Sequence, residues 1–373
     1  MRVLVVAAPL TGHLLPLVPL AVALRALGHE VTIASGGELR SVAGFPVHDI
    51  GTRLRLAPLA LRLAATHPRL VGPELRGTAG TAAVGPMFGA VNARLVDEVA
   101  ALAEAVPPDL VVHEPLAVSG AVVAAARRVP AALVAGMLWD GPELVAVTAR
   151  DRAMVAAAAR YGVTELPVPA AVVTTAPRSV VGPREGLLMR PDGVAESGSA
   201  PDWVLRPSDR PRLLVSHSTL PGAGAHLRSV VAAADALDAE VVLVRAPEKI
   251  VRAGLPANVR AVGWVPMDQA LAHATAIVHH GGAGTTLAAL AAGVPQLVVA
   301  GAGDRRYNAR LVAARGAGLA TTAAQIDAPL LRTLLSAAPL RAAAVEVAAE
   351  IAGLPSPAEV APVVAAAGAR SAC

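Results

Sequence analysis

Short apolar runs alternate with longer amphipathic stretches along the chain, and this pattern predicts strands that are each followed by a helix. The first run, Arg2 to Ala8, is typical of a central parallel strand that is covered on both faces. A helix to about Leu27 should follow, ended by Gly28, and Val31 to Ala34 should be the next strand. This order opens a β-α-β unit.

The same alternation continues to the end of the chain. In the first half it predicts strands at 109–113 and 131–135 and helices near 92–105, 116–128 and 143–161. In the second half it predicts strands at 212–216, 240–245, 258–262, 276–280 and after 295. It predicts single helices near 224–237, 267–273, from 282 and near 357–368, and more than one helix within 325–352. Two successive runs of this kind imply an α/β protein with two doubly wound sheets that face one another.

Two stretches interrupt the alternation. Prolines and glycines break residues 53–89 into helical pieces, and such variable segments often line a binding site. The periodicity fails from Pro183 to Pro211, so we place a domain boundary near residue 207. We expect an N-terminal domain over residues 1–207 and a C-terminal domain over residues 208–355. Residues 356–373 should form a terminal helix and tail, with the option of packing back on the N-terminal domain.

Composition narrows the class of protein. With 373 residues, 54% hydrophobic and 16% charged, the chain should form two well-packed globular domains. Its net charge of +4 comes from scattered arginines without a basic run, which argues against nucleic-acid binding. Prolines interrupt the apolar N-terminus, which argues against a signal peptide or an integral membrane span. The one cysteine, Cys373, suits a cytoplasmic location. The oligomeric state stays open, with a homodimer as one option.

The segment from Ala276 to Thr285 predicts an anion site. An apolar strand leads through His279, His280 and two glycines into a helix. The glycines let a ligand approach the backbone, and the free N–H groups of a helix N-terminus bind anions. Both histidines can donate hydrogen bonds to phosphate oxygens. We expect a phosphate or diphosphate here, and the alternative is a tight turn without a ligand.

His13 is the first candidate for catalysis. It follows the first strand, at the sheet edge where ligands of α/β proteins bind, and an imidazole can remove a proton near neutral pH. Glu114 and Asp140 also follow strands of this half, and they compete as the carboxylate that orients His13. The alternatives are a histidine that caps its turn and carboxylates on solvated loops.

These motifs together resemble the GT-B glycosyltransferases of the UGT-like family, above all the actinomycete enzymes that attach deoxysugars to antibiotics. His279–Thr286, followed by Gly293–Gln296 and by Asp304 and Asn308, is similar to the family segment that holds the diphosphate and sugar of a nucleotide-sugar. Gly12-His13-Leu14-Leu15-Pro16 is similar to the family's opening, in which the histidine deprotonates the acceptor hydroxyl.

The resemblance also implies the donor-binding residues. Gly263–Gln269 is similar to the base-binding segment, in which Trp264 stacks on the pyrimidine, although a place in the core is the alternative for this residue. Ser216–Thr219 resembles the loop near the phosphates but lacks its usual glycine. The implied donor-binding residues are Ser216, Ser218, Thr219, Trp264, Val265, His280, Gly281, Gly282, Ala283, Gly284, Thr285, Asp304 and Arg305.

Two departures from the family refine the expectation, and so does the lack of a metal-binding motif that the other glycosyltransferase architecture uses. Ala288 replaces a Glu that holds both ribose hydroxyls in glucose-transferring relatives, which suits a dTDP donor. Arg305 replaces a common Gln beside Asp304, which suits a sugar with hydroxyls removed. No Asp-x-Asp motif is present, so the helix N-terminus and His280 should stabilise the leaving group without a metal.

The resemblance therefore implies a GT-B fold with two Rossmann-like domains and an interdomain cleft. It implies inverting, metal-independent transfer of a deoxysugar from a dTDP-sugar to an apolar aglycone such as a polyketide, as an O- or C-glycoside, in antibiotic biosynthesis. The dTDP-sugar is a co-substrate, and no cofactor is expected. The alternatives are a UDP-sugar-dependent transferase, a GT-B epimerase and a non-catalytic partner protein. A dehydrogenase is disfavoured, because the opening strand lacks Gly-x-Gly-x-x-Gly.

Overall fold

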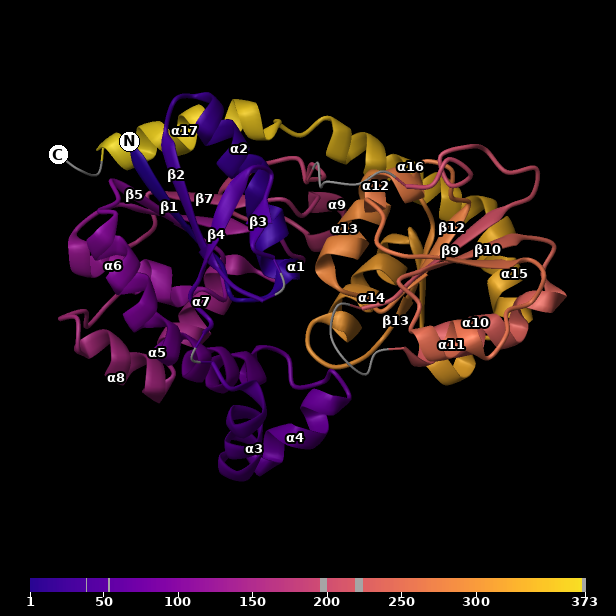
Figure 1. Cartoon of the computed structure of the whole chain (residues 1–373), viewed down its shortest axis with the longest axis horizontal. Helices are drawn as coiled ribbons and strands as arrows, with labels where there is room; N and C mark the ends of the chain where they lie inside the picture. The colour runs from indigo at the N-terminus through magenta and orange to yellow at the C-terminus, as the bar shows by residue number, and fades with distance from the viewer. Residues whose placement is uncertain (38, 53, 195–199, 219–223, 371–373) are drawn as a thin grey trace.

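Two mainly parallel sheets organise the chain (Figure 1). The computed structural model describes residues 1–37, 39–52, 54–194, 200–218 and 224–370. The first sheet has the order β3-β4-β2-β1-β5-β6-β7-β8, and the second has the order β11-β10-β9-β12-β13-β14. In sequence order the strands are β1 (Arg2–Val6), β2 (Glu30–Ser35), β3 (Ser41–Val42), β4 (Phe45–Asp49), β5 (Leu110–His113), β6 (Ala131–Ala135), β7 (Ala171–Thr174), β8 (Leu187–Leu188), β9 (Arg212–Ser216), β10 (Glu240–Val244), β11 (Val259–Val262), β12 (Ala276–His279), β13 (Gln296–Val299) and β14 (Gly318–Thr321).

Helices connect most of these strands and cover both sheets. They are α1 (Thr11–Leu14), α2 (Val18–Ala26), α3 (Leu56–Thr66), α4 (Pro68–Leu75), α5 (Thr81–Ala105), α6 (Val118–Arg127), α7 (Gly141–Ala149), α8 (Arg152–Ala159), α9 (Arg178–Val181), α10 (Ala225–Ala233), α11 (Glu248–Arg252), α12 (Met267–Leu271), α13 (Ala283–Ala291), α14 (Arg305–Arg315), α15 (Ala328–Ser336), α16 (Ala338–Ala352) and α17 (Pro357–Arg370). The expectation of two α/β sheets with parallel strands is confirmed.

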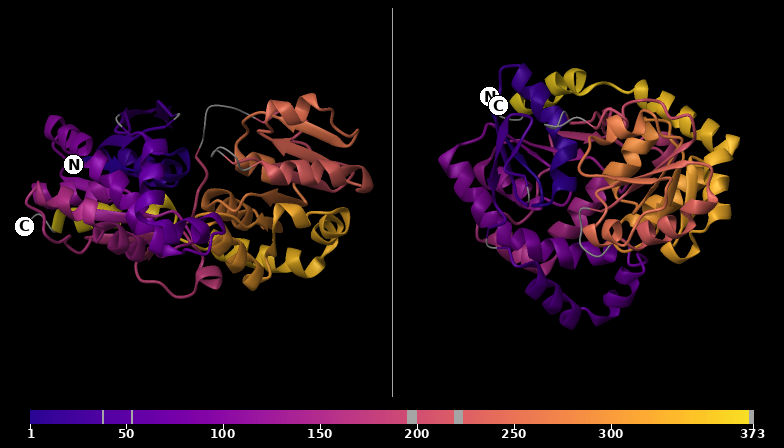
Figure 2. Two further views of the ribbon diagram at one scale, coloured as in Figure 1. Left: turned by 90° about the horizontal axis from the view of Figure 1, so that it is seen from below. Right: turned by 45° about the vertical axis from the view of Figure 1, so that its right-hand side comes forward.

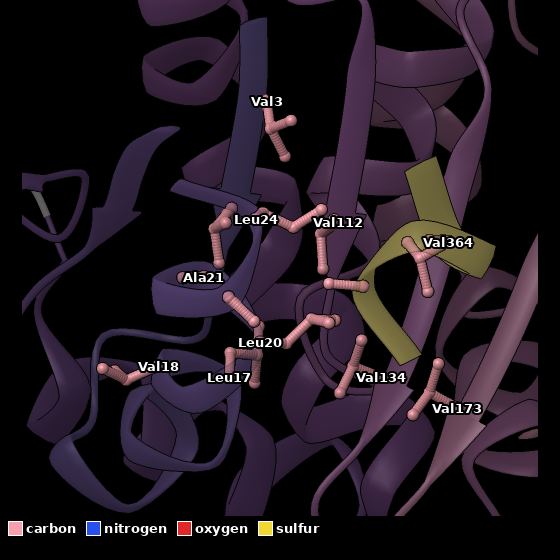
Figure 3. Close-up of a cluster of buried hydrophobic side chains, with 14 of the residues drawn as sticks. Val3, Leu17, Val18, Leu20, Ala21, Leu24, Val112, Val134, Val173 and Val364 are labelled. Atoms are coloured by element: carbon pink, nitrogen blue, oxygen red, sulfur yellow. The ribbon is translucent and has the colours of Figure 1, made fainter. Parts of the chain in front are cut away.

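The core of the N-terminal half is built from small and medium apolar side chains of the central strands. Val112 of β5 and Val134 of β6 are buried with Leu20 of α2 (Figure 3). Val364 of α17 belongs to the same buried cluster, so the last helix completes the core of the first half. Figures 1 and 2 show how the chain returns across both halves, so that α17 lies against α2 of the first half.

A second hydrophobic cluster joins the two halves. Leu138 and Val180 of the N-terminal half are buried with Leu287 and Leu290 of α13 and with Val347 of α16. The chain passes from the first sheet to the second between β8 and β9. The boundary near residue 207 falls in this connection and stays a prediction.

Several predicted elements differ from the observed ones at their ends. The helix expected over 143–161 is two helices, because Asp151 accepts a hydrogen bond from Ala153 N at 3.0 Å and so begins α8. The helices expected within 325–352 are α15 and α16, which meet at Ala337, with proline in the first turn of α16. Strand β7 was not predicted, because its four residues carry no periodic signal beside the prolines before it.

In the described part of the chain, no single helix has the length and apolar character to cross a bilayer. One pair, 338–352 with 357–369, meets the length and composition criteria together, with a bend of 48° between its helices.

Candidate active site

His13 and Glu114 meet at the carboxyl edge of the first sheet. His13 lies in α1, which follows β1, and Glu114 comes directly after β5. Strands β1 and β5 are parallel neighbours, with Val6 opposite His113, so both residues emerge at one edge. The Nδ1 atom of His13 lies 3.3 Å from Oε1 of Glu114. The two atoms do not meet hydrogen-bond geometry, and at this distance they form an ion pair when His13 is protonated.

Backbone donors fix the Glu114 carboxylate. Its Oε1 atom accepts from Ala8 N at 3.1 Å, and its Oε2 atom accepts from Leu116 N at 2.8 Å. The residue is 1% exposed. A buried carboxylate with two backbone donors has one orientation, and in that orientation it faces the imidazole.

The charges around His13 raise its pKa. Burial lowers the pKa of this imidazole, but the Glu114 carboxylate and, more weakly, the Asp304 carboxylate act in the opposite sense, and the pKa is raised above 6.5 overall. Asp304 belongs to the C-terminal half. The electrostatic interaction therefore shows that the two halves bring a histidine and a carboxylate toward each other.

Asp140, the competing carboxylate, has a different place. It is the N-cap of α7, where Oδ1 accepts a hydrogen bond from Glu143 N at 3.0 Å. Its Oδ2 atom lies 3.8 Å from Nε of Arg184. The structure thus brings Glu114 into contact with His13 and assigns Asp140 the contacts of a helix cap.

The turn between β12 and α13 exposes a helix N-terminus. Gly281 has φ +84°, and Gly282 is the N-cap of α13 without a side-chain cap. The first N–H groups of the helix, at Ala283, Gly284 and Thr285, are therefore available to an anion. A Cβ atom on Gly282 would lie 2.6 Å from Nε2 of His280, so a larger residue there would displace the His280 ring.

His279 shapes this turn from inside. It is fully buried, its Nδ1 atom accepts from Gly281 N at 3.1 Å, and its Nε2 atom lies 2.8 Å from Oε1 of Gln296. Burial, opposed by the bond to Gln296, lowers its pKa to about 4. The expectation that both histidines donate to phosphate is therefore wrong for His279, because both of its ring nitrogens are engaged.

His280 is the histidine that remains available. Its Nδ1 atom is buried and has no hydrogen-bond partner among the residues that the structure describes. Burial first, and then His279 and Arg305, hold the pKa of His280 well below its ordinary value. It is a neutral imidazole with one N–H to donate.

Asp304, Arg305 and Asn308 lie on the next loop and at the start of α14. Nδ2 of Asn308 donates to the Gly281 carbonyl and to Oδ2 of Asp304, both at 2.8 Å, and so ties this loop to the turn. Burial raises the pKa of Asp304, opposed by Asn308 and His13. The side chain of Arg305 makes neither a hydrogen bond nor an ion pair within the described ranges, and it interacts electrostatically with Asp304. Its guanidinium is thus a candidate partner for an anion.

Trp264 lies on the surface between β11 and α12. It is 46% exposed, so the reading of this residue as core is wrong, and the guanidinium of Arg245 lies 4.8 Å from the ring centroid. Val265, by contrast, is buried in a core cluster. A partly exposed indole beside a buried anchor is a kind of surface on which a base can stack.

The remaining donor-site candidates belong to the segment that begins with the last residue of β9. Ser216 and Ser218 are buried, and Ser216 lies opposite His279 in the sheet register. Thr219 lies outside the described residues. The sequence analysis missed His226, which is buried with Nε2 at 3.0 Å from the Ser216 carbonyl and interacts electrostatically with His280. Nothing local marks His226, because it lies inside a helix ten residues away.

In the ranges that the structure describes, His, Cys, Asp and Glu side chains form no group of three with the arrangement of a metal site.

Family models and known proteins match the chain over nearly its whole length. The N-terminal and C-terminal domain models of the erythromycin biosynthesis protein CIII-like family match residues 22–218 and 228–367. The chain is 38% identical to elloramycin glycosyltransferase ElmGT of Streptomyces olivaceus, covering 97% of the chain and 96% of that protein. It is 35% identical to L-demethylnoviosyl transferase of Streptomyces niveus, with coverages of 86% and 84%.

Solved structures agree with this. The glycosyltransferase SnogD from Streptomyces nogalater has a TM-score of 0.82 at 34% identity, with coverages of 98% and 99%. Streptomyces sp. SF2575 glycosyltransferase SsfS6 complexed with thymidine diphosphate has a TM-score of 0.81 at 27% identity, with coverages of 98% and 99%. Spinosyn rhamnosyltransferase SpnG complexed with spinosyn aglycone has a TM-score of 0.79 at 26% identity, with coverages of 98% and 100%. The chain is therefore a GT-B glycosyltransferase of the erythromycin biosynthesis protein CIII-like family.

Proposed function

We propose that this glycosyltransferase moves a deoxysugar from a dTDP-sugar to an apolar polyketide-type aglycone, with inversion and without a metal ion. The observation that carries the proposal is the meeting of two sets of groups. His13 with Glu114 comes from the N-terminal half, and Asp304 with the α13 N-terminus comes from the C-terminal half.

His13 is the proposed base. With a proton on Nδ1 held toward Glu114, the Nε2 lone pair takes the proton of the acceptor hydroxyl. The acceptor oxygen then bonds to the anomeric carbon as the bond from that carbon to the diphosphate oxygen breaks, and the electron pair leaves with dTDP. Attack opposite the leaving group inverts the anomeric carbon, through an oxocarbenium-like state.

The leaving diphosphate gains negative charge as it departs. We assign its stabilisation to the uncapped N–H groups of Ala283–Thr285, to His280, whose Nδ1 atom has no partner in the described part of the chain, and to the Arg305 guanidinium. Preorganised donors of this kind can supply several kcal/mol, on the order of 3 per donor at an oxyanion site. These groups, together with the lack of an Asp-x-Asp motif, support transfer without a metal.

The donor base and sugar follow from three positions. Trp264 is the proposed stacking surface for thymine, and Ala288 leaves room where a ribose-binding Glu would hold a 2′-hydroxyl. Asp304 is the proposed partner of the remaining sugar hydroxyls. The relative that is complexed with thymidine diphosphate supports this choice of nucleotide.

The acceptor is proposed from the relatives alone. One of them is named for elloramycin, and another is complexed with the spinosyn aglycone. The same base supports attack by a hydroxyl oxygen or, for a phenol, by a ring carbon, so both O- and C-glycosides fit the proposal.

Calorimetry with dTDP, UDP and NAD in the presence of EDTA tests the donor. We expect tight binding of dTDP that weakens in His280→Ala and Arg305→Ala, and weaker binding of UDP. Equal or tighter binding of UDP would overturn the argument from Ala288. Loss of dTDP binding on addition of EDTA would overturn metal independence of donor binding. If no nucleotide binds, the proposed function is wrong.

A further inference from the structure

Helix α4 reaches from the N-terminal half to the loop that carries Asp304. Oε1 of Glu74, in the last turn of α4, accepts a hydrogen bond from Gly303 N at 3.0 Å. Nε of Arg306 donates to the carbonyl of Arg76 at 2.6 Å. In Figure 1, α3 and α4 extend from the N-terminal half toward the C-terminal half. Segment 53–89, which the sequence predicted only as broken helical pieces, therefore contacts the C-terminal half.

Glycine is required where the two backbones meet. Gly77 has φ +65°, and a Cβ atom on it would lie 1.8 Å from the carbonyl oxygen of Gly301. The same glycine ends α4 in a Schellman motif, since Gly77 N donates to Glu74 O and Thr78 N donates to Pro73 O, both at 2.8 Å. The helix end that orients Glu74 is therefore the part of the chain that touches the loop.

The loop held in this way carries the proposed sugar-binding carboxylate. Asp304 follows Gly303 directly, and Asn308 ties it to the turn of Gly281 on its other side. Asp304 also interacts electrostatically with His13 across the two halves. The bond from Gly303 to Glu74 is thus one residue away from the group that would hold the sugar opposite the base.

We propose that Glu74 is a positioning residue, which fixes the loop Gly301–Asp304 so that Asp304 presents the donor sugar to His13. This inference rests on the proposed function. Within the described ranges, the side chain of Glu74 bonds to Gly303 and makes no hydrogen bond or ion pair with His13 or with the residues proposed to hold the nucleotide. Its loss should therefore misplace the sugar without weakening the binding of the nucleotide. Small misplacements of a reacting group cost up to about a hundredfold in rate.

Three variants of the full chain test this role. Glu74→Ala removes the acceptor, Glu74→Gln keeps a side-chain oxygen that can accept from Gly303, and Glu104→Ala is the matched control at an exposed glutamate of α5. We expect hydrogen exchange of the loop 301–304 to be roughly ten- to a hundredfold faster in Glu74→Ala, as for loss of a charged hydrogen bond. Glu74→Gln should lie close to the wild type, and Glu104→Ala should match it.

Transfer and dTDP binding complete the test. With a donor and acceptor that the wild type turns over, we expect Glu74→Ala to lower kcat by about ten- to a hundredfold and to keep the calorimetric Kd for dTDP within about twofold. Unchanged exchange in Glu74→Ala, or faster exchange with unchanged kcat, overturns the positioning role. Failure of the wild type to bind dTDP would instead count against the proposed function, and the exchange experiment would still decide whether Glu74 holds the loop.

Discussion

The Nδ1 atom of His13 lies 3.3 Å from the Oε1 atom of Glu114, although the two residues are about a hundred positions apart in sequence. Strand register explains the contact, because β1 and β5 are neighbours and end at the same level. The carboxylate is held by Ala8 N and Leu116 N, so it does not rotate away. The register of β1 and β5 therefore brings together the two segments that carry the base and its partner.

Replacing Glu114 should change both the rate and its pH dependence. The neutral form of His13 is the base, so kcat/KM should rise with pH through the pKa of His13, which lies above 6.5 in the wild type. Glu114→Gln removes the charge that raises this pKa, so the midpoint should move to lower pH. The maximal kcat/KM should also fall by roughly ten- to a hundredfold, the loss of ~1.5–3 kcal/mol for a charged contact. A pH–rate profile measures both effects, and an unmoved midpoint would contradict the pairing.

Asp140→Ala should affect stability instead. This residue caps α7, and removal of an N-cap costs about 1 kcal/mol of the free energy of unfolding. The midpoint of the pH–rate profile should stay where it is in the wild type. Denaturant unfolding and the same pH profile measure the two quantities. If the midpoint moved as it should in Glu114→Gln, Asp140 would be the partner of His13 and the assignment would be reversed.

The choice between these carboxylates shows what the sequence could not decide. Both residues follow buried strands, and local pattern places both at one sheet edge. The order of the sheet separates them, because β5 pairs with β1 whereas β6 lies one strand further away. That order depends on long-range packing. One local signal was nevertheless present, since Asp140 with Glu143 three residues later is the pattern of a helix N-cap.

For the two histidines at the end of β12, part of the arrangement could likewise be predicted from the sequence and part could not. The strand, the glycine turn and the helix were all predicted from local pattern. Adjacent residues of a strand point to opposite faces, so His279 and His280 could not both face one ligand. This alternation was readable from the sequence. The identity of the buried partner, Gln296, was not, because it comes from the neighbouring strand.

Trp264→Ala should weaken the binding of dTDP without unfolding the protein. Stacking of a base on an aromatic side chain contributes about 1–3 kcal/mol, so the Kd should rise by roughly five- to a hundredfold. The ring is 46% exposed, so the free energy of unfolding should change little. Calorimetric titration with dTDP measures the effect, and Trp264→Phe should retain part of the affinity.

Trp203→Ala is the matched control for that experiment. This ring packs on a core cluster, with the Arg260 guanidinium 3.5 Å from its centroid. Its loss should lower the free energy of unfolding and leave the Kd for dTDP unchanged once the protein is folded. Equal losses of dTDP affinity in both variants would show that Trp264 acts through stability and not by stacking.

His279 should make the free energy of unfolding depend on pH. Its pKa is about 4 in the folded chain and close to 6.5 when unfolded, so between these values the unfolded state binds more protons. Stability is therefore fully present above pH 6.5 and falls as the pH drops toward 4, by roughly 3 kcal/mol from this residue. Burial lowers the pKa of His113 and His280 as well, so the total slope should be steeper.

His279→Leu should be less stable at neutral pH, because Gly281 N and Gln296 lose their partner, yet its stability should fall less between pH 6.5 and 4. Denaturant unfolding across this range measures the slope, with His67→Gln, at an exposed histidine, as the control. An identical slope in His279→Leu and in the control would mean that His279 is not a buried, neutral imidazole. The assignment of the phosphate-facing role to His280 alone would then lose its basis.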